Sequence, residues 1–289
     1  MASSGLRPYA GVTAVLASMH AKERTIAPVL EAGLGLVIAP AVGLNTDQFG
    51  TFSRDIARKG SPSEAARAKI AAGFDVRPDA RVGIASEGCF GPHPRIPFLA
   101  QDTELVLLCD RDSGLELAGY HATLETNFGH TLARTVEDAM AFAERSGFPG
   151  HGLIVMGCRD GHPDPAAALE KDARDGPALE GAVRSAIRRF GAAWVETDMR
   201  AHRNPTRMTA IGRAARDLVR RFHSRCPDCG CPGFDVTELL AGLPCACCGE
   251  PTAVAAIAIL RCPSCGCRRE RPVSSDRTAD PARCGLCNP

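Results

Sequence analysis

The distribution of cysteine is the feature that most constrains how this chain can fold. The sequence has 289 residues and 14 cysteines, and 11 of the cysteines lie between Cys226 and Cys287. The first 225 residues contain only Cys89, Cys109 and Cys158. The thiols therefore belong to a C-terminal module, and they do not form a disulfide framework for the whole chain.

Eight of these cysteines form four pairs with Cys-x-x-Cys spacing. The pairs are Cys226 and Cys229, Cys245 and Cys248, Cys262 and Cys265, and Cys284 and Cys287. Two thiolates at this spacing can chelate one ion, and four thiolates make a closed tetrahedral zinc site. The sequence therefore predicts two structural Zn²⁺ ions in a zinc-ribbon domain at residues 225–289.

The spacing leaves the partnership of the four pairs open. Sequential pairing would give tandem ribbons, whereas nested or crossed pairing would give one compact module. Cys231, Cys247 and Cys267 are not needed for two sites, although either Cys247 or Cys248 could serve as the ligand. The ribbon is expected to be a structural staple or a docking surface for protein, with nucleic acid as the alternative because of the basic segment 268–271.

The rest of the chain has the composition of an ordinary globular protein. Apolar residues make up 45%, charged residues 23%, and the net charge is +1, so no strong attraction to nucleic acid or membrane is expected. No apolar run approaches the roughly 20 residues of a membrane span. The short apolar run at residues 11–21 does not match an export signal well, and a cytoplasmic location is expected.

Patterns of apolar residues predict alternating strands and helices. Strands are expected at 12–18, 34–40, 81–86, 152–157 and 192–197, and helices at 21–31, 61–73, 136–147, 178–191 and 204–224. Residues 104–110 and 114–120 flank a turn and predict a hairpin. Ser61 and Glu64 fit a capping box, Gly73 fits a helix end, and Asn204 fits an N-cap.

This order predicts an α/β fold with one mixed sheet and flanking helices. The expected domains are a flexible N-terminus at 1–10, an α/β domain at 11–224 and the zinc ribbon at 225–289. The strand at 12–18 is apolar almost throughout, so it is expected inside the sheet.

Polar residues interrupt the apolar scaffold at three places. Lys22 follows the first strand and opens a helix, a position from which it can grip a phosphate. Glu87 is expected to end the strand at 81–86 and to share a Mg²⁺ site with Glu64. The alternatives are that Glu64 only caps its helix and that Glu87 accepts hydrogen bonds from the following turn.

The third place is the segment 196–208, which gathers arginine and histidine around the start of the last helix. His202, Arg203 and Arg207 lie in this segment. A helix N-terminus flanked by arginines is a natural site for an anion. The alternative is a solvated, well-capped helix start.

Taken in order, these segments resemble the inosine triphosphate pyrophosphatase superfamily, including its Maf-like branch. "VLASMHAKERTIAPVLEAGLGLVIAP" is similar to the opening strand, phosphate-gripping turn, helix and second strand of that family. "SEAARAKIAAG" resembles its Glu-Asn-Ala-x-x-Lys-Ala helix at Glu64 and Lys69, and "AHRNPTRMTAIGRAA" resembles its base-reading turn and final helix. The whole layout also resembles an uncharacterised bacterial family with a terminal Cys-rich ribbon, through "SEGCFGPHP", "DMRAHRNPTRM" and "CGLCNP".

The resemblance implies a metal-dependent nucleoside triphosphate pyrophosphohydrolase. Lys22 and Lys69 would then bind phosphates, Glu64 and Glu87 would hold Mg²⁺, and His202 with Arg203 and Arg207 would face the nucleotide. The alternative is a non-catalytic protein that binds a nucleotide or a partner and docks through its ribbon.

Overall fold

The computed structural model describes residues 9–50, 56 and 60–289. Most of the N-terminal segment expected to be flexible, residues 1–8, lies outside this range. Contacts divide the chain into two compact units, Met1–Val219 and Arg220–Pro289. No helix in the described part is long and apolar enough to cross a membrane.

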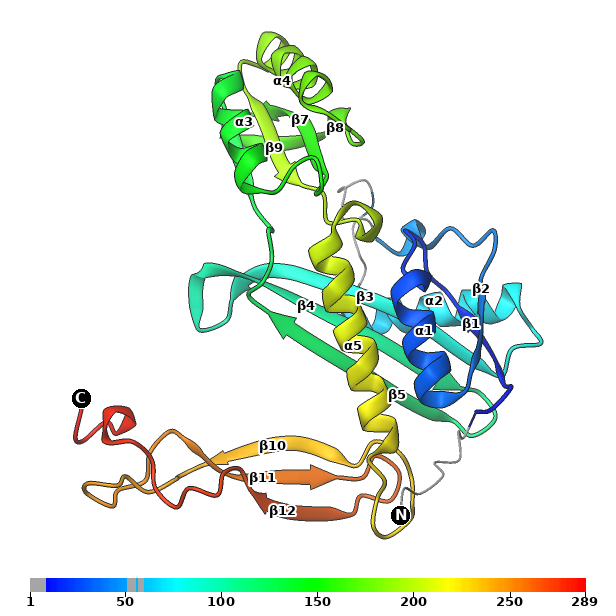
Figure 1. Cartoon of the computed structure of the whole chain (residues 1–289), viewed down its shortest axis with the longest axis vertical. Helices are drawn as coiled ribbons and strands as arrows, with labels where there is room; N and C mark the ends of the chain where they lie inside the picture. The colour runs from blue at the N-terminus through cyan, green and yellow to red at the C-terminus, as the bar shows by residue number, and fades with distance from the viewer. Residues whose placement is uncertain (1–8, 51–55, 57–59) are drawn as a thin grey trace. The chain divides into compact units, whose positions relative to one another are not determined.

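The first unit contains two sheets, whereas the sequence predicted one (Figure 1). The first sheet has the order β2-β1-β3-β4-β5 and is mixed, with parallel β1–β2 and β1–β3 pairs and antiparallel β3–β4 and β4–β5 pairs. Its strands are β1 (Thr13–Leu16), β2 (Val37–Pro40), β3 (Val82–His93), β4 (Ile96–Asp110) and β5 (Leu115–Thr123). The first strand lies inside the sheet, as its apolar sequence predicted, and the expected hairpin is antiparallel.

Helices cover both faces of this sheet. They are α1 (Glu23–Leu34), α2 (Pro62–Val76) and α5 (Pro205–His223). Apolar side chains of α2 pack on alternate residues of β3 and β4, including Ala85, Leu105 and Leu107. On the opposite face, α5 is anchored to β5 because the backbone N–H of Tyr120 donates to Asp217 Oδ2 at 2.9 Å.

Helix α2 begins as predicted but does not end as predicted. Ser61 and Glu64 form the capping box, with Ser61 N donating to Glu64 Oε2 at 2.7 Å. Gly73 lies inside the helix, which continues to Val76. A Cβ at Gly73 would come within 3.1 Å of the Ala17 side chain, so this glycine serves the close approach of helix and sheet.

The second sheet is antiparallel and lies between β5 and α5 in the chain. Its order is β6-β9-β7-β8, with β6 (His130–Ala133), β7 (Leu153–Arg159), β8 (His162–Glu170) and β9 (Ala193–Thr197). Helices α3 (Val136–Arg145) and α4 (Gly176–Phe190) share a core with it. The sequence patterns missed β6, which has only four residues, and β8, which carries two prolines and a charged residue near its start.

The second unit contains a three-stranded antiparallel sheet between its cysteine pairs. The strands are β10 (Asp235–Ala241), β11 (Ala255–Arg261) and β12 (Arg268–Pro272), in that order.

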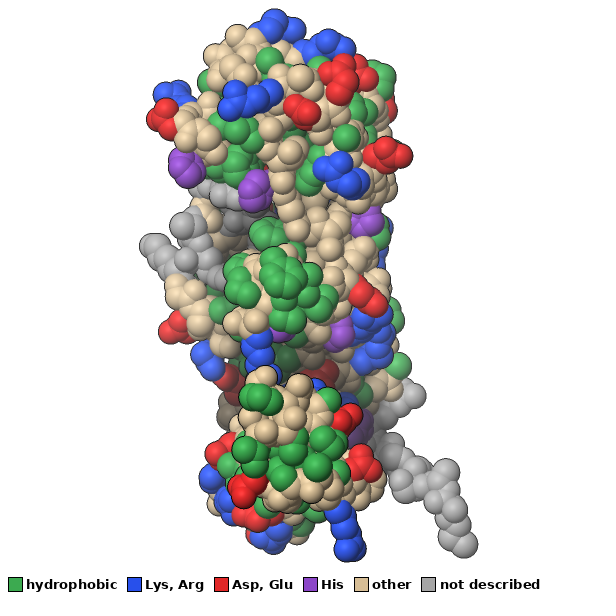
Figure 2. Space-filling view, turned by 90° about the vertical axis from the view of Figure 1, so that its left-hand side faces the viewer, with side chains coloured by type: hydrophobic (Ala, Val, Ile, Leu, Met, Phe, Trp, Pro, Cys, Tyr) green, Lys and Arg blue, Asp and Glu red, His purple; other side chains and the backbone are tan. Residues whose placement is uncertain are grey.

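Three short 3₁₀ helices are described along the whole chain: η1 (Thr46–Phe49), η2 (Ala201–Arg203) and η3 (Pro281–Arg283). Basic and acidic side chains are interspersed on the face drawn in Figure 2, in keeping with a net charge of +1.

Candidate functional site

The topology of the first sheet creates a place for a ligand beside β1. Helices α1 and α2 follow β1 and β2 on opposite faces, so the connections diverge outside the carboxyl end of β1. Ligands of open α/β sheets tend to bind at such a switch point. A pocket of about 420 Å³, including its open mouth, lies there. It is lined by Met19, His20, Lys22, Thr46, Asp47, Gly50, Lys69, Glu87, Arg200 and Arg207.

The turn between β1 and α1 has an unusual backbone. His20 and Ala21 have φ angles of +64° and +59°, in the left-handed region. Each such non-glycine residue costs about 1–2 kcal/mol. Contacts hold the turn, because His20 Nε2 lies 3.1 Å from Asp47 Oδ1 and its ring stacks on His202 at 4.9 Å. Lys22 directly follows this strained turn, which places its side chain in the wall of the pocket.

Lys22 has neutral partners, although it lies in an ionic environment. Its Nζ donates to Ser86 Oγ at 3.1 Å and to Ser86 O at 3.4 Å, and the residue is only 5% exposed. Burial, followed by the charges of Arg207 and Lys69, lowers the pKa of the Lys22 amine to about 7.

Lys69 and Glu87 form an ion pair inside the pocket wall. Lys69 Nζ and Glu87 Oε1 are in direct contact, and both side chains are buried. Strand β3 does not end at Glu87 but continues to His93, with Glu87 opposite Leu105 of β4. The expectation of a strand tip was therefore wrong, because the apolar pattern stops where the sheet begins to face this pocket.

Arg207 connects the pocket with the covered face of the sheet. Its Nε donates to Glu104 Oε1 at 2.6 Å, and both residues are at most 1% exposed. Its guanidinium also donates to the Met199 carbonyl and lies 5.2 Å from the centre of the Phe90 ring. The backbone N–H of Arg207 donates to Asn204 Oδ1 at 3.0 Å, so Asn204 caps the start of α5.

A second carboxylate lies two residues from Glu104 on the same face of β4. Asp102 is 1% exposed. Burial, followed by the neighbouring charge of Glu104, raises the pKa of Asp102 to about 8, and the charge of Arg207 opposes this. Asp102 is therefore protonated at neutral pH, when Glu104 pairs with Arg207.

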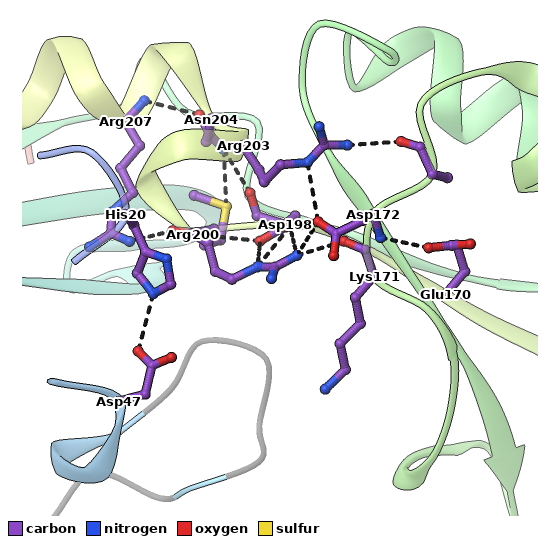
Figure 3. A network of polar contacts seen from close by, with 12 residues as sticks. His20, Asp47, Glu170, Lys171, Asp172, Asp198, Arg200, Arg203, Asn204 and Arg207 are labelled. Carbon is purple, nitrogen blue, oxygen red and sulfur yellow. Dashed lines mark hydrogen bonds and ion pairs between the residues drawn. The ribbon is translucent and has the colours of Figure 1, made fainter. Parts of the chain in front are cut away.

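Arg200 lines another side of the pocket, where it takes part in the network of polar contacts drawn in Figure 3. Its Nε lies 3.0 Å from Asp198 Oδ2, and its Nη2 donates to the Lys171 carbonyl at 2.6 Å. Asp198 is fully buried, and its Oδ1 also accepts from the backbone N–H of Arg200 at 2.9 Å. This pairing fixes the direction of the Arg200 guanidinium.

The structure brings together four of the seven residues predicted for catalysis or substrate binding. Lys22, Lys69, Glu87 and Arg207 line the pocket. The fifth, His202, stacks on His20, which lines it.

Glu64 and Arg203 have other partners. The carboxylate of Glu64 completes the capping box and lines a separate pocket beside η1, so we do not include it in the site. Arg203 Nη2 donates to the Ala173 carbonyl at 2.8 Å. The sequence patterns missed Glu104 and Asp102: Glu104 opens the predicted strand at 104–110, and Asp102 lies just before it.

The cysteine pairs form two groups of four thiols in the second unit. Cys226, Cys229, Cys262 and Cys265 form the first group, and Cys245, Cys248, Cys284 and Cys287 form the second. Sulfur–sulfur distances of 3.6 and 3.7 Å in the first group, and 3.6 and 3.9 Å in the second, rule out disulfides there. Four sulfurs placed tetrahedrally at the usual Zn–S distance of ~2.3 Å would be ~3.8 Å apart. Both groups could therefore hold a metal ion such as zinc.

In each group, backbone N–H groups donate to one buried thiol, Cys245 in the second group and Cys262 in the first. The N–H groups of Cys248 and Cys247 lower the pKa of the Cys245 thiol to about 7. In the first group, the N–H of Ser264 donates to Cys262 Sγ at 3.4 Å. Such donors favour the thiolate, which is the form that binds metal.

The antiparallel sheet of this unit explains the crossed pairing. The start of β10 lies opposite the end of β11, with Asp235 beside Arg261. The first and third cysteine pairs therefore meet at one end of the sheet. Strand β12 runs back antiparallel to β11, so the fourth pair joins the second at the other end.

Of the two candidates in "CACC", Cys248 belongs to the group of four, and Cys247 does not.

Comparison with known proteins places the chain in a family. The model of a domain of unknown function, DUF6671, matches residues 72–289. This range covers more than half of the chain. The chain belongs to the DUF6671 family. The match contains the cysteine groups, Glu87, Glu104 and Arg207, whereas Lys22 and Lys69 precede it.

No curated protein matches this DUF6671 chain. The resemblance to the inosine triphosphate pyrophosphatase superfamily is not shown, and it remains a hypothesis based on short motifs. The resemblance to an uncharacterised family with a terminal Cys-rich ribbon agrees with the family match and with the two cysteine groups.

Proposed function

We propose that the unit Met1–Val219 binds a small molecule carrying a phosphate group, of which nucleotides are the expected class. The observation that carries this proposal is the charge of the pocket. Lys69, Arg200 and Arg207 each face a buried carboxylate, whereas Lys22 donates to Ser86 and pairs with no carboxylate among the residues that the structure describes. When protonated, Lys22 therefore adds a positive charge that a bound anion would compensate.

The start of α1 adds to this preference. Lys22 is the N-cap of α1, so the positive end of a 12-residue helix begins at the pocket. Backbone N–H groups at a helix N-terminus and side chains such as Lys22 commonly hold phosphate together. The pocket suits one phosphate group at its base, and the remainder of the ligand would lie in its open mouth.

Binding can be tested by calorimetry with inorganic phosphate, pyrophosphate and a panel of nucleoside triphosphates at low salt. We expect at least one of these compounds to bind the parent protein and to lose affinity at least tenfold in Lys22→Met. Lys171→Met is the matched control, because Lys171 does not line the pocket. Equal affinity in the parent and Lys22→Met, or no binding of any phosphate compound, contradicts the proposal.

Hydrolysis of a phosphoanhydride bond is a second candidate, favoured by the carboxylate of Glu87 in the pocket. Mg²⁺ needs only one or two carboxylates when water and substrate phosphates complete its shell, and Glu87 would supply that ligand. Bound there, Mg²⁺ would neutralise phosphate charge and activate water. Release of pyrophosphate from a nucleoside triphosphate only when Mg²⁺ is present would support catalysis. Binding without release would leave a nucleotide-binding protein.

We assign a structural role to the ribbon within this proposal. Its cysteine groups lie at the two ends of one small sheet, where each metal ion would tie two chain segments together. Docking of protein or nucleic acid through the ribbon remains a separate hypothesis. The exposed basic strand β12 is the feature that favours nucleic acid.

A further inference from the structure

The two lysines of the pocket have different chemical environments. The chain contains only four lysines: Lys22, Lys59, Lys69 and Lys171. Lys69 Nζ is in direct contact with the carboxylate of Glu87, so this amine is engaged in a buried ion pair. Lys22 is held by a hydroxyl and a carbonyl of Ser86, which accept hydrogen bonds from a neutral amine as well as from a charged one.

The described ion pairs around Lys22 balance one another without a proton on its amine. Three buried or half-buried cations lie opposite three buried carboxylates in the pairs Lys69–Glu87, Arg200–Asp198 and Arg207–Glu104. A proton on Lys22 would add a positive charge beside Arg207 and Lys69 that no carboxylate of residues 9–50 or 60–289 pairs with directly. The amine is therefore poised to give up this proton near neutral pH.

Charged groups of α5, α2, β4 and β3 act on the titration of Lys22. Burial lowers the pKa of Lys22 most, and Arg207 of α5 and Lys69 of α2 lower it further. Glu104 of β4 and Glu87 of β3 act in the opposite direction. The outcome is a pKa of about 7, so a large fraction of the amine is neutral at neutral pH.

We infer that Lys22 is a nucleophilic amine that forms an imine with an aldehyde or ketone carrying an anionic group. The lone pair of Nζ would form a bond to the carbonyl carbon, and the carbonyl oxygen would take up a proton. Both amine protons and the carbonyl oxygen then leave as one water molecule, so the step needs no oxidant or reductant. A lysine desolvated beside other cations is a recurrent way to prepare an amine for this reaction.

The pocket contains the groups that such a step requires. Ser86 Oγ lies 3.1 Å from Nζ and can relay the amine proton. Arg200 and Arg207 line the same pocket and present positive charge to the anionic group of the ligand. This inference goes beyond phosphate binding, because it adds a covalent step. It rests on the proposed function only for the anionic part of the ligand.

Reductive trapping tests the inference on the full-length protein. The probes are glycolaldehyde phosphate and its uncharged counterpart glycolaldehyde, each with cyanoborohydride, followed by peptide mass mapping. We expect glycolaldehyde phosphate to label Lys22 at least tenfold faster than Lys171 at pH 7. The rate at Lys22 should level off above about pH 8, whereas labelling of an ordinary lysine should keep rising toward its usual pKa near 10.4.

Variants separate the imine from the binding of the anion. Lys22→Arg keeps a cation but should abolish labelling at position 22 without new labelling at Lys69. Ser86→Ala should slow labelling at Lys22, because it removes the hydroxyl next to the amine. If Lys22 is labelled no faster than Lys171 by either probe, the inference is overturned, and phosphate binding measured by calorimetry still stands. Equal labelling by both probes overturns the requirement for an anionic group and counts against the proposed function as well.

Discussion

Lys69 of α2 and Glu87 of β3 form an ion pair in which both side chains are buried. This pair explains why an apolar strand carries a carboxylate in its middle. A buried carboxylate is tolerated only when a cation or hydrogen-bond donors meet it. Here the cation comes from a helix that the sequence places before the strand, and both residues also line the pocket.

Glu87→Gln should therefore destabilise the protein, since it leaves Lys69 buried opposite a neutral amide. Removing one partner of a buried pair costs about 3–5 kcal/mol, and the retained acceptor oxygen should keep the loss near the lower end. The loss is measured as the difference between the free energies of unfolding of the parent and the variant in urea. The combination with Lys69→Met should recover part of the loss, and a coupling below about 0.5 kcal/mol would show that the pair is not formed.

A matched control lies on the outer face of the same helix. Arg67 contacts Glu116 at 2.6 Å, but both side chains are exposed. Glu116→Gln should have a much smaller effect, because solvent already screens that pair. Similar losses in the two variants would mean that burial does not set the strength of the Lys69–Glu87 interaction.

Gly88→Ala should displace Arg207 from its place over the sheet. A Cβ at Gly88 would lie 2.6 Å from Glu104 Oε1 and 2.7 Å from Arg207 Nη2, closer than such contacts allow. The expected loss is about 1–3 kcal/mol, as for other overpacked sites. Gly91→Ala in the same strand is the control, since a Cβ there meets no atom of the described residues within 4 Å. Equal unfolding free energies for the two variants would contradict the geometry of this cluster.

The sequence correctly predicted helix ends and strands that are marked by local patterns of capping or apolar residues. The capping box at Ser61 and Glu64 and the apolar run of β1 are local signals, and both were read correctly. The ion-pair partners of Glu87 and Glu104 could not be predicted from local sequence patterns. Lys69 and Arg207 reach them from helices 18 and 103 residues away, a relationship that appears only when the sheet order is known.

The crossed cysteine pairing illustrates the same limit. Spacing identified the four cysteine pairs as candidate metal ligands but not which pairs belong together, because pairing depends on the direction of the strands between them. Residues 235–241 and 255–261 carry the alternating or apolar patterns of strands. Had these two segments been recognised as antiparallel neighbours, the pairing of first with third and second with fourth would have followed.

Asp102→Asn should change how stability depends on pH. The pKa of Asp102 is raised from 3.8 to about 8, so between these values the native state holds a proton that the unfolded state has lost. The contribution of Asp102 to stability is therefore fully present below pH 4 and is lost as pH rises to 8, by up to about 1.4 kcal/mol per pH unit. The variant lacks this loss, so it should gain stability relative to the parent from pH 5 to 8 in urea unfolding.

Asp110, at the other end of β4, is the control. Its pKa is lowered and not raised, so its effect on the pH dependence of stability has the opposite sign. Burial tends to raise the pKa of Asp110, but hydrogen bonds from Arg81 and Ser113 outweigh it and hold the pKa well below its usual value. Its contribution to stability is present above pH 4 and is lost at lower pH. Asp110→Asn should therefore cost stability at neutral pH. A stability difference between Asp102→Asn and the parent that does not vary with pH would contradict the protonated state of Asp102.

The metal content of the second unit should distinguish neighbouring cysteines. We expect two Zn²⁺ per chain in the parent protein by elemental analysis after native purification. Cys248→Ser should lower the content toward one, because Cys248 belongs to the second group, whereas Cys247→Ser should keep two. Loss of zinc from Cys247→Ser with retention in Cys248→Ser would reverse the ligand assignment.

Removal of metal should unfold the second unit and leave the first folded. The described core of the second unit is small and is built around Phe234 and the cysteines themselves, so bound metal ions would contribute much of its folding free energy. The first unit has separate apolar cores against α2 and against α3 and α4. After chelation, amide hydrogen exchange should rise throughout β10–β12 while protection persists in β1, β3, β4 and β7. The ribbon would have a sufficient core of its own if its strands stayed protected after both ions had been removed.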